Sequence, residues 1–126
     1  MSRPYISQAL RQKVAEDAKH RCGYCLTVQE FTAMPMEIEH IIPFTLGGPS
    51  TEDNLWLACP ICNSHKATKV TAIDPHTKED VPLFHPRQQN WQDHFEWSDD
   101  GTQIIGKTAI GRATVDSLQM NNIHFL

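Results

Sequence analysis

The chain has 126 residues, of which 40% are hydrophobic and 21% are charged, and no long apolar run predicts a membrane-spanning segment. This length suits a single domain, residues 1–126, and the absence of a signal-peptide pattern predicts a cytoplasmic protein with reduced cysteines. The formal net charge of −4 argues against tight, salt-resistant binding of nucleic acid, which normally needs a basic face.

The first predicted element is an N-terminal helix that begins after Ser7 and ends near His20. Ser7 is a suitable N-cap residue, and Leu10, Val14 and Ala18 recur every four positions between polar and charged residues. We interpret this segment as a surface helix that packs its apolar face against the rest of the chain.

Two cysteine pairs with the same spacing follow, Cys22-Gly-Tyr-Cys25 and Cys59-Pro-Ile-Cys62. Two C-x-x-C pairs can arrange four thiolates tetrahedrally around Zn²⁺, with bonds of about 2.3 Å. The long interval between the pairs must hold further structure. A redox pair, disulfides and unrelated buried thiols are the alternatives, but reduced thiols in paired spacing favour a structural zinc site.

The interval between the cysteine pairs predicts a strand, a loop and a second strand. Residues 36–42 form the first predicted strand, which Pro43 ends, and Gly47-Gly48-Pro49 breaks the chain into a loop. Residues 54–58 form a second short strand, and a helix then runs from Pro60 to about Lys69. The order is ββα, which predicts an α+β fold.

The C-terminal part of the chain predicts a second group of elements. Residues 71–86 are expected to form a polar connector, and an aromatic segment follows at residues 91–97. Asp100-Gly101 predicts a turn, with residues 102–105 as one strand of a hairpin. A last helix is predicted to begin at Thr108.

Three side chains of the central segment suggest metal-dependent hydrolysis of a phosphodiester. A neutral His40 can take a proton from water near physiological pH. Glu39 and Asn63 offer the oxygen ligands that one Mg²⁺ or Mn²⁺ prefers, although adjacent strand residues need a local bend to converge. Packing or surface exposure is the alternative interpretation for His40, and helix capping is the alternative for Asn63.

The segment from Glu37 to Lys66, E-I-E-H-I-I-P-F-T-L-G-G-P-S-T-E-D-N-L-W-L-A-C-P-I-C-N-S-H-K, resembles the HNH endonuclease motif, the ββα-metal or His-Me finger class. The resemblance implies that His40 is the general base and that Asn54 braces the loop bearing it. Asn63 matches the third motif position, a metal ligand, and Glu39 stands where the family often has Asp.

The resemblance extends over a core motif at residues 22–69, because the cysteine pairs match a branch of small bacterial HNH proteins that is braced by zinc on four cysteines. Residues 71–126 look like the C-terminal extension of many such proteins. His65 and Lys66 follow the motif on the predicted helix. They are candidates for phosphate contact, with solvated helix residues as the alternative.

These features together predict an endonuclease that hydrolyses nucleic acid, with DNA expected, a structural zinc and a catalytic Mg²⁺ or Mn²⁺. The acidic excess does not oppose this prediction, because it lies in residues 71–126, which carry four Lys or Arg against eight Asp or Glu. The alternative is a zinc-braced module that binds nucleic acid or protein without catalysis. A cysteine-based redox protein is a weaker third interpretation.

Overall fold

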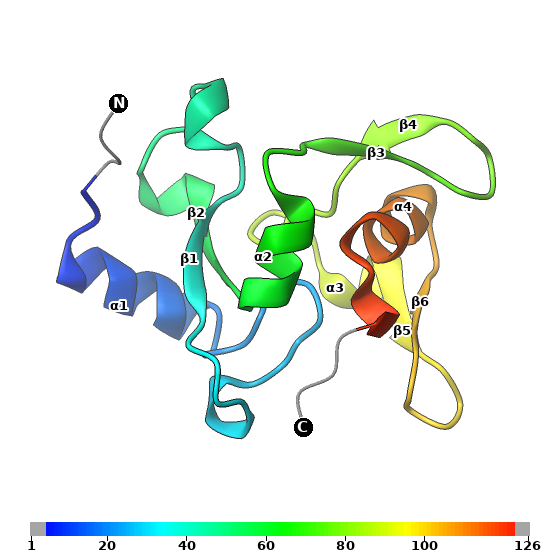
Figure 1. Ribbon diagram of the computed structural model, residues 1–126, viewed down its shortest axis with the longest axis horizontal. Coiled ribbons are helices and arrows are strands. Elements are labelled where there is room, and N and C mark those ends of the chain that lie inside the picture. Colours follow the sequence, from blue (N-terminus) through cyan, green and yellow to red (C-terminus); the bar gives the residue numbers. More distant parts are fainter. Residues whose placement is uncertain (1–4, 123–126) are drawn as a thin grey trace.

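The computed structural model describes residues 5–122, and Figure 1 shows its helices and strands. Helix α1 (Gln8–Asp17) begins as predicted, because the Ser7 hydroxyl accepts a hydrogen bond of 3.1 Å from the Leu10 amide. It ends three residues before the predicted His20, since Lys19 and His20 take left-handed backbone conformations with φ of 55° and 57°.

The predicted ββα unit is present. Strands β1 (Glu37–His40) and β2 (Leu55–Ala58) pair antiparallel, with His40 opposite Leu55 and Glu37 opposite Ala58. Helix α2 (Pro60–Lys66) follows, and the Cys59 sulfur caps it by accepting from the Cys62 amide. It ends before the predicted Lys69, because Ala67 has a positive φ of 50° that a continuing helix excludes.

The segment expected to be a polar connector instead contains an antiparallel hairpin, β3 (Thr71–Ile73) and β4 (Asp80–Pro82). The buried carboxylate of Asp74 organises its turn by accepting from the His76 and Thr77 amides and the Thr77 hydroxyl. Arg112 pairs with both oxygens of Asp74 at 2.9 Å. The expectation failed because Arg112, the charged partner of Asp74, lies thirty-eight residues later in the chain, where a local sequence pattern does not reveal the pairing.

The remaining elements agree with the predicted C-terminal hairpin and helix. A short helix α3 (Trp91–His94) precedes β5 (Phe95–Trp97), which pairs with β6 (Ile104–Gly106). Helix α4 (Ala109–Leu118) begins after Thr108, whose hydroxyl accepts from the Gly111 amide. Within residues 5–122 the strands form three two-stranded sheets, so the fold is α+β as predicted.

The main core joins the ββα unit to the C-terminal elements. All four cysteines belong to one buried cluster together with Tyr24, Phe84, Phe95 and Leu118. In Figure 1, α2 lies between β1 on one side and α4 on the other, and it contacts both. No helix in the described part of the chain is long and apolar enough to cross a membrane.

Candidate active site

The four cysteine sulfurs form a compact cluster. They all lie within 4.8 Å of one another, and the Cys25 and Cys59 sulfurs are 3.8 Å apart. A tetrahedral Zn²⁺ with bonds of ~2.3 Å would place its sulfur ligands ~3.8 Å apart, so this cluster fits the ion. All four residues are buried and none is in a disulfide, and burial raises the pKa of the Cys22 thiol. A bound cation would offset the cost of burying thiolates here.

Each cysteine pair is joined directly to a side chain of the candidate site. In the first pair, the buried Tyr24 hydroxyl donates a hydrogen bond to Oε1 of Glu39. In the second pair, Asn63 follows Cys62 directly on α2. Tyr24 was not predicted from the sequence. The signal that could have found it is an aromatic residue with a polar tip inside a C-x-x-C pair, where burial would require a partner for its hydroxyl.

Glu39 is a buried carboxylate with one unsatisfied oxygen. It is only 3% exposed, and its Oε2 has no hydrogen-bond partner among residues 5–122. Burial raises the pKa of the Glu39 carboxyl to about 7, while the Lys66 ammonium and the Tyr24 hydroxyl act in the opposite direction. An unpaired carboxylate oxygen costs stability, and a divalent cation is the kind of ligand that would satisfy it.

His40 is held at one ring nitrogen. Its Nε2 lies 2.8 Å from the Ser50 hydroxyl, and the ring of Phe44 is tilted against it at 6.2 Å between centroids. Burial and then the charge of Lys66 lower the pKa of His40 below its ordinary value of 6.5. The imidazole is therefore neutral at physiological pH, as a general base must be. Ser50 was also not predicted, since a serine in a loop carries no distinctive signal.

Asn63 lines the same surface groove as His40 and Glu39. Its Nδ2 donates to the Glu37 carboxylate at 2.8 Å, which leaves the carbonyl oxygen of the amide for another ligand. A groove of about 670 Å³ is lined by these residues together with Arg11 and Phe44. All three residues predicted to carry the chemistry thus line one groove, and a carboxyl and an amide oxygen are the kinds of ligand that Mg²⁺ or Mn²⁺ prefers.

Asn54 fixes the backbone of the loop that follows His40. Its Oδ1 accepts from the Ile42 amide at 2.9 Å, and its Nδ2 donates to the Ile42 and Pro49 carbonyls at 3.0 and 2.9 Å. The loop needs a glycine at position 48, because a Cβ there would lie 1.7 Å from the Ile42 carbonyl oxygen. Asn54 is therefore placed where the resemblance expected a bracing residue.

Comparison with known protein families agrees with this geometry. Residues 22–69 match the family model of the HNH endonucleases. The resemblance found in the sequence is thereby confirmed over the segment that holds the cysteine cluster, both strands and α2. No curated protein and no solved structure matches the chain. The HNH match indicates a nuclease or another function that involves nucleic acid.

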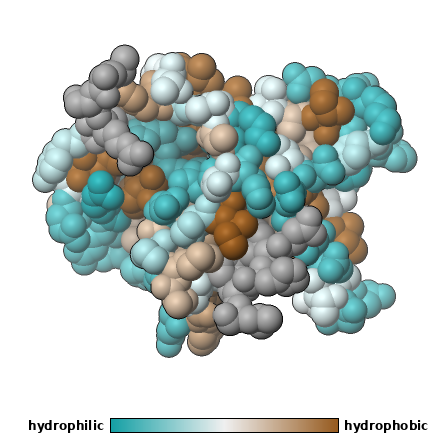
Figure 2. Space-filling view, in the orientation of Figure 1, coloured by the Kyte–Doolittle hydropathy of each residue, from teal (hydrophilic) through white to brown (hydrophobic). Residues whose placement is uncertain are grey.

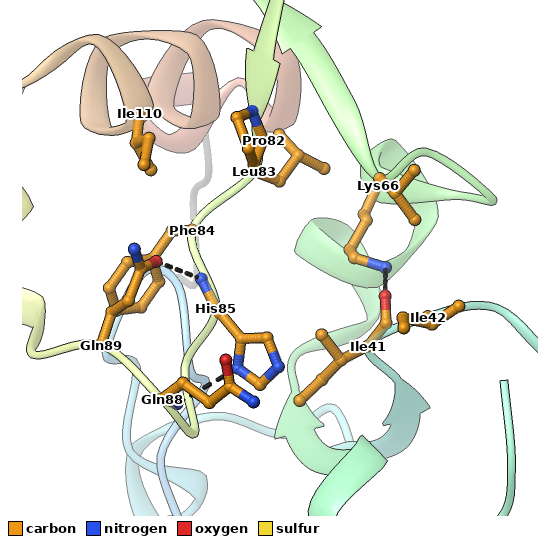
Figure 3. Close-up of a pocket in the computed structure, with 11 residues that line it drawn as sticks. Ile41, Ile42, Lys66, Pro82, Leu83, Phe84, His85, Gln88, Gln89 and Ile110 are labelled. Carbon is orange, nitrogen blue, oxygen red and sulfur yellow. Dashed lines mark hydrogen bonds between the residues drawn. The ribbon is translucent and has the colours of Figure 1, made fainter.

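The two residues predicted to contact phosphate lie at the end of the HNH segment and already have protein partners. His65 Nδ1 lies 2.9 Å from the Leu118 carbonyl oxygen, which ties α2 to α4. Lys66 is buried, and its ammonium donates to the Ile41 carbonyl at 3.0 Å (Figure 3). Their contact with phosphate stays a prediction. The observed bond of Lys66 instead supports the backbone directly after His40.

Proposed function

We propose that the protein is a metal-dependent endonuclease that hydrolyses phosphodiester bonds in DNA. One observation carries the proposal: His40, whose imidazole is neutral, and Glu39, whose buried Oε2 has no partner among the described residues, are both lining residues of the same groove. A module that only binds nucleic acid has no use for that combination. The cysteine cluster would hold a structural zinc, and Glu39 and Asn63 would hold the catalytic Mg²⁺ or Mn²⁺.

His40 is the general base in this proposal. A neutral imidazole has one protonated nitrogen and one free lone pair. If the Nε2 hydrogen is donated to the Ser50 hydroxyl, the lone pair is on Nδ1, which is the atom that would accept the proton of the attacking water. Ser50 would thus hold the Nε2 side of the ring in either tautomer, and the packed Phe44 ring would restrict the rotation of the imidazole.

The other residues of the groove position the reacting groups. Tyr24 holds Oε1 of Glu39, so that Oε2 is the oxygen left for the cation. Glu37 orients Asn63 in the same manner, through the amide nitrogen. When bound, the cation would neutralise charge on the phosphate and on the departing oxygen.

The test is the cleavage of DNA by purified, zinc-loaded protein with Mg²⁺ or Mn²⁺. The wild-type protein should cleave circular DNA that is offered both as plasmid duplex and as single strand, and His40→Ala should abolish the activity on whichever form is cleaved. His76→Ala is the matched control, because His76 is an exposed histidine in the β3–β4 turn and lies outside the groove. Metal-dependent cleavage that persists in His40→Ala would refute the assignment of the base. Binding without any cleavage would favour the non-catalytic module instead.

A further inference from the structure

The loop after His40 exposes three large hydrophobic side chains. Ile42, Phe44 and Leu46 are 47%, 38% and 58% exposed. Phe44–Leu46 form a short 3-10 helix, which lies above β1 at the top of Figure 1. Figure 2 shows hydrophobic surface in the same region. Apolar side chains grouped in this way often mark a binding surface.

The loop has a fixed shape. Asn54 binds both backbone groups of Ile42, and the Leu46 and Gly48 amides both donate to the Pro43 carbonyl, at 2.9 and 3.0 Å. Pro43 itself is buried, so it anchors the loop to the interior. The exposure of the apolar side chains therefore comes from a well-hydrogen-bonded backbone, which presents them outward in a defined arrangement.

The loop adjoins the reacting groups and contributes residues to two hollows. Phe44 lines the groove that contains His40, and the two rings are 6.2 Å apart. Ile42 lines a second cavity of about 360 Å³, where His85 and Gln88 also lie (Figure 3). If the phosphate to be cleaved comes to His40, a nucleotide beside it can lie against this loop, which contributes Phe44 to the groove. The surface is thus continuous with the proposed cleavage groove.

The charges of the groove do not favour binding through phosphates. Among the described residues that line it, the ionisable ones are one cation, Arg11, with Glu37, Glu39 and His40. Apart from the contribution of a bound cation, affinity that comes from neutralised phosphates should accordingly be small. Stacking of nucleobases on aromatic side chains, worth about five- to hundredfold per base, and burial of apolar side chains against the base faces are other sources of affinity.

We propose that the Ile42–Leu46 loop contacts the faces of unstacked nucleobases next to the cleaved phosphate. The substrate class would then be nucleic acid with unpaired bases, such as single strands, flaps or mismatched segments, because an intact duplex hides its base faces. This inference rests on the proposed endonuclease function, of which it specifies the substrate.

Binding experiments with a cleavage-deficient protein test this proposal. His40→Ala protein with Mg²⁺ is titrated into fluorescent single-stranded, duplex and bubble-containing oligonucleotides, and anisotropy is measured. The single strand and the bubble should bind at least tenfold more tightly than the duplex. Phe44→Ala and Leu46→Ala should each weaken single-strand binding about fivefold or more and leave duplex binding unchanged. In the cleavage assay, where His40 is intact, Leu46→Ala separates the effect of the loop from any disturbance of the His40 ring, since Phe44 is the residue that contacts that ring.

Ile73→Ala is the matched control. Ile73 is similarly exposed, at 51%, but lies on the β3–β4 hairpin. The Ile73→Ala variant should bind all oligonucleotides with the same affinity as the His40→Ala protein into which it is introduced. The proposal would be overturned if duplex and single strand bound with equal affinity. It would also be overturned if Ile73→Ala weakened single-strand binding as much as the loop variants do, or if neither loop variant weakened it. Absence of binding to every oligonucleotide would overturn it as well.

A parallel cleavage assay with intact His40 separates the two proposals. If base-dependent binding is found but no substrate is cleaved, the endonuclease function fails while the loop retains its role in binding. If duplex and single strand are cleaved at equal rates, and Leu46→Ala cleaves as the wild type does, the loop proposal fails alone.

Discussion

Replacing Asn54 by Ala tests how the loop beside the general base is held. The side chain is 6% exposed and makes three hydrogen bonds of 2.9 to 3.0 Å, all to backbone groups of Ile42 and Pro49. The alanine variant would remove all three bonds at once. It would also leave the Ile42 amide without its partner.

The expected loss of stability follows from the number of bonds. Each contributes about 0.5–1.5 kcal/mol net, so three contribute roughly 1.5–4.5 kcal/mol, and we expect a loss of about 3 kcal/mol. For a chain of this size the corresponding decrease in Tm is on the order of 10 °C. Because Ile42 lies two residues after His40, cleavage should also fall, by about a hundredfold for a displacement near 1 Å.

Denaturant unfolding of zinc-loaded protein measures the first effect, and plasmid cleavage below the transition measures the second. Asn121→Ala is the matched control, since Asn121 binds the amide and carbonyl of Ile104 at 2.7 and 3.0 Å, far along the chain from His40. It should lower stability by about 1–3 kcal/mol and leave cleavage unchanged. A stability of Asn54→Ala within about 0.5 kcal/mol of the wild type would refute the bracing role. An equal effect of both variants on cleavage would refute the link to His40.

Three further predictions concern the metals and the C-terminal elements. Cys59→Ser should lose zinc and cooperative unfolding, as measured by metal analysis and calorimetry, because the buried cluster needs the ion. The pKa of Glu39 is about 7, and a cation that binds its carboxylate must displace the proton. Mn²⁺ affinity, measured by titration calorimetry, should therefore be about tenfold weaker at pH 6 than at pH 8. Glu39→Gln should remove this pH dependence. Arg112 lowers the pKa of Asp74, so this pair stabilises the fold above the ordinary carboxyl pKa, and the stabilisation is lost as the pH falls. Asp74→Asn should therefore lower Tm at pH 7 and make Tm depend less on pH in the acid range.

The parts of the structure that could be predicted depend on short-range patterns. The ββα order follows from the breaks at Pro43 and at the glycines, and the cysteine cluster follows from two identical spacings. The grouping of Glu39, His40 and Asn63 in one groove follows from the same two constraints. Their catalytic roles stay predictions that the cleavage and metal-binding experiments test.

The parts that sequence reasoning missed depend on partners far apart in the chain. Asp74 lies in a segment that resembles a loop, and its partner in the hairpin turn, Arg112, lies thirty-eight residues later. Tyr24 meets Glu39 only once the cysteine pairs and β1 are in place. No local propensity contains that information, because the same residues would be loop and surface residues in another fold.

The cysteine cluster positions the candidate cation site from both sides. Tyr24, between the first two cysteines, holds one oxygen of Glu39, and Asn63 directly follows the last cysteine. A structural zinc that fixes both pairs would therefore fix the distance between the two candidate ligands of the second metal. This arrangement explains how the protein can keep a buried carboxylate with an unsatisfied oxygen, a feature that lowers stability by itself. A fold stabilised by zinc would offset that cost and would hold the oxygen in place for a cation.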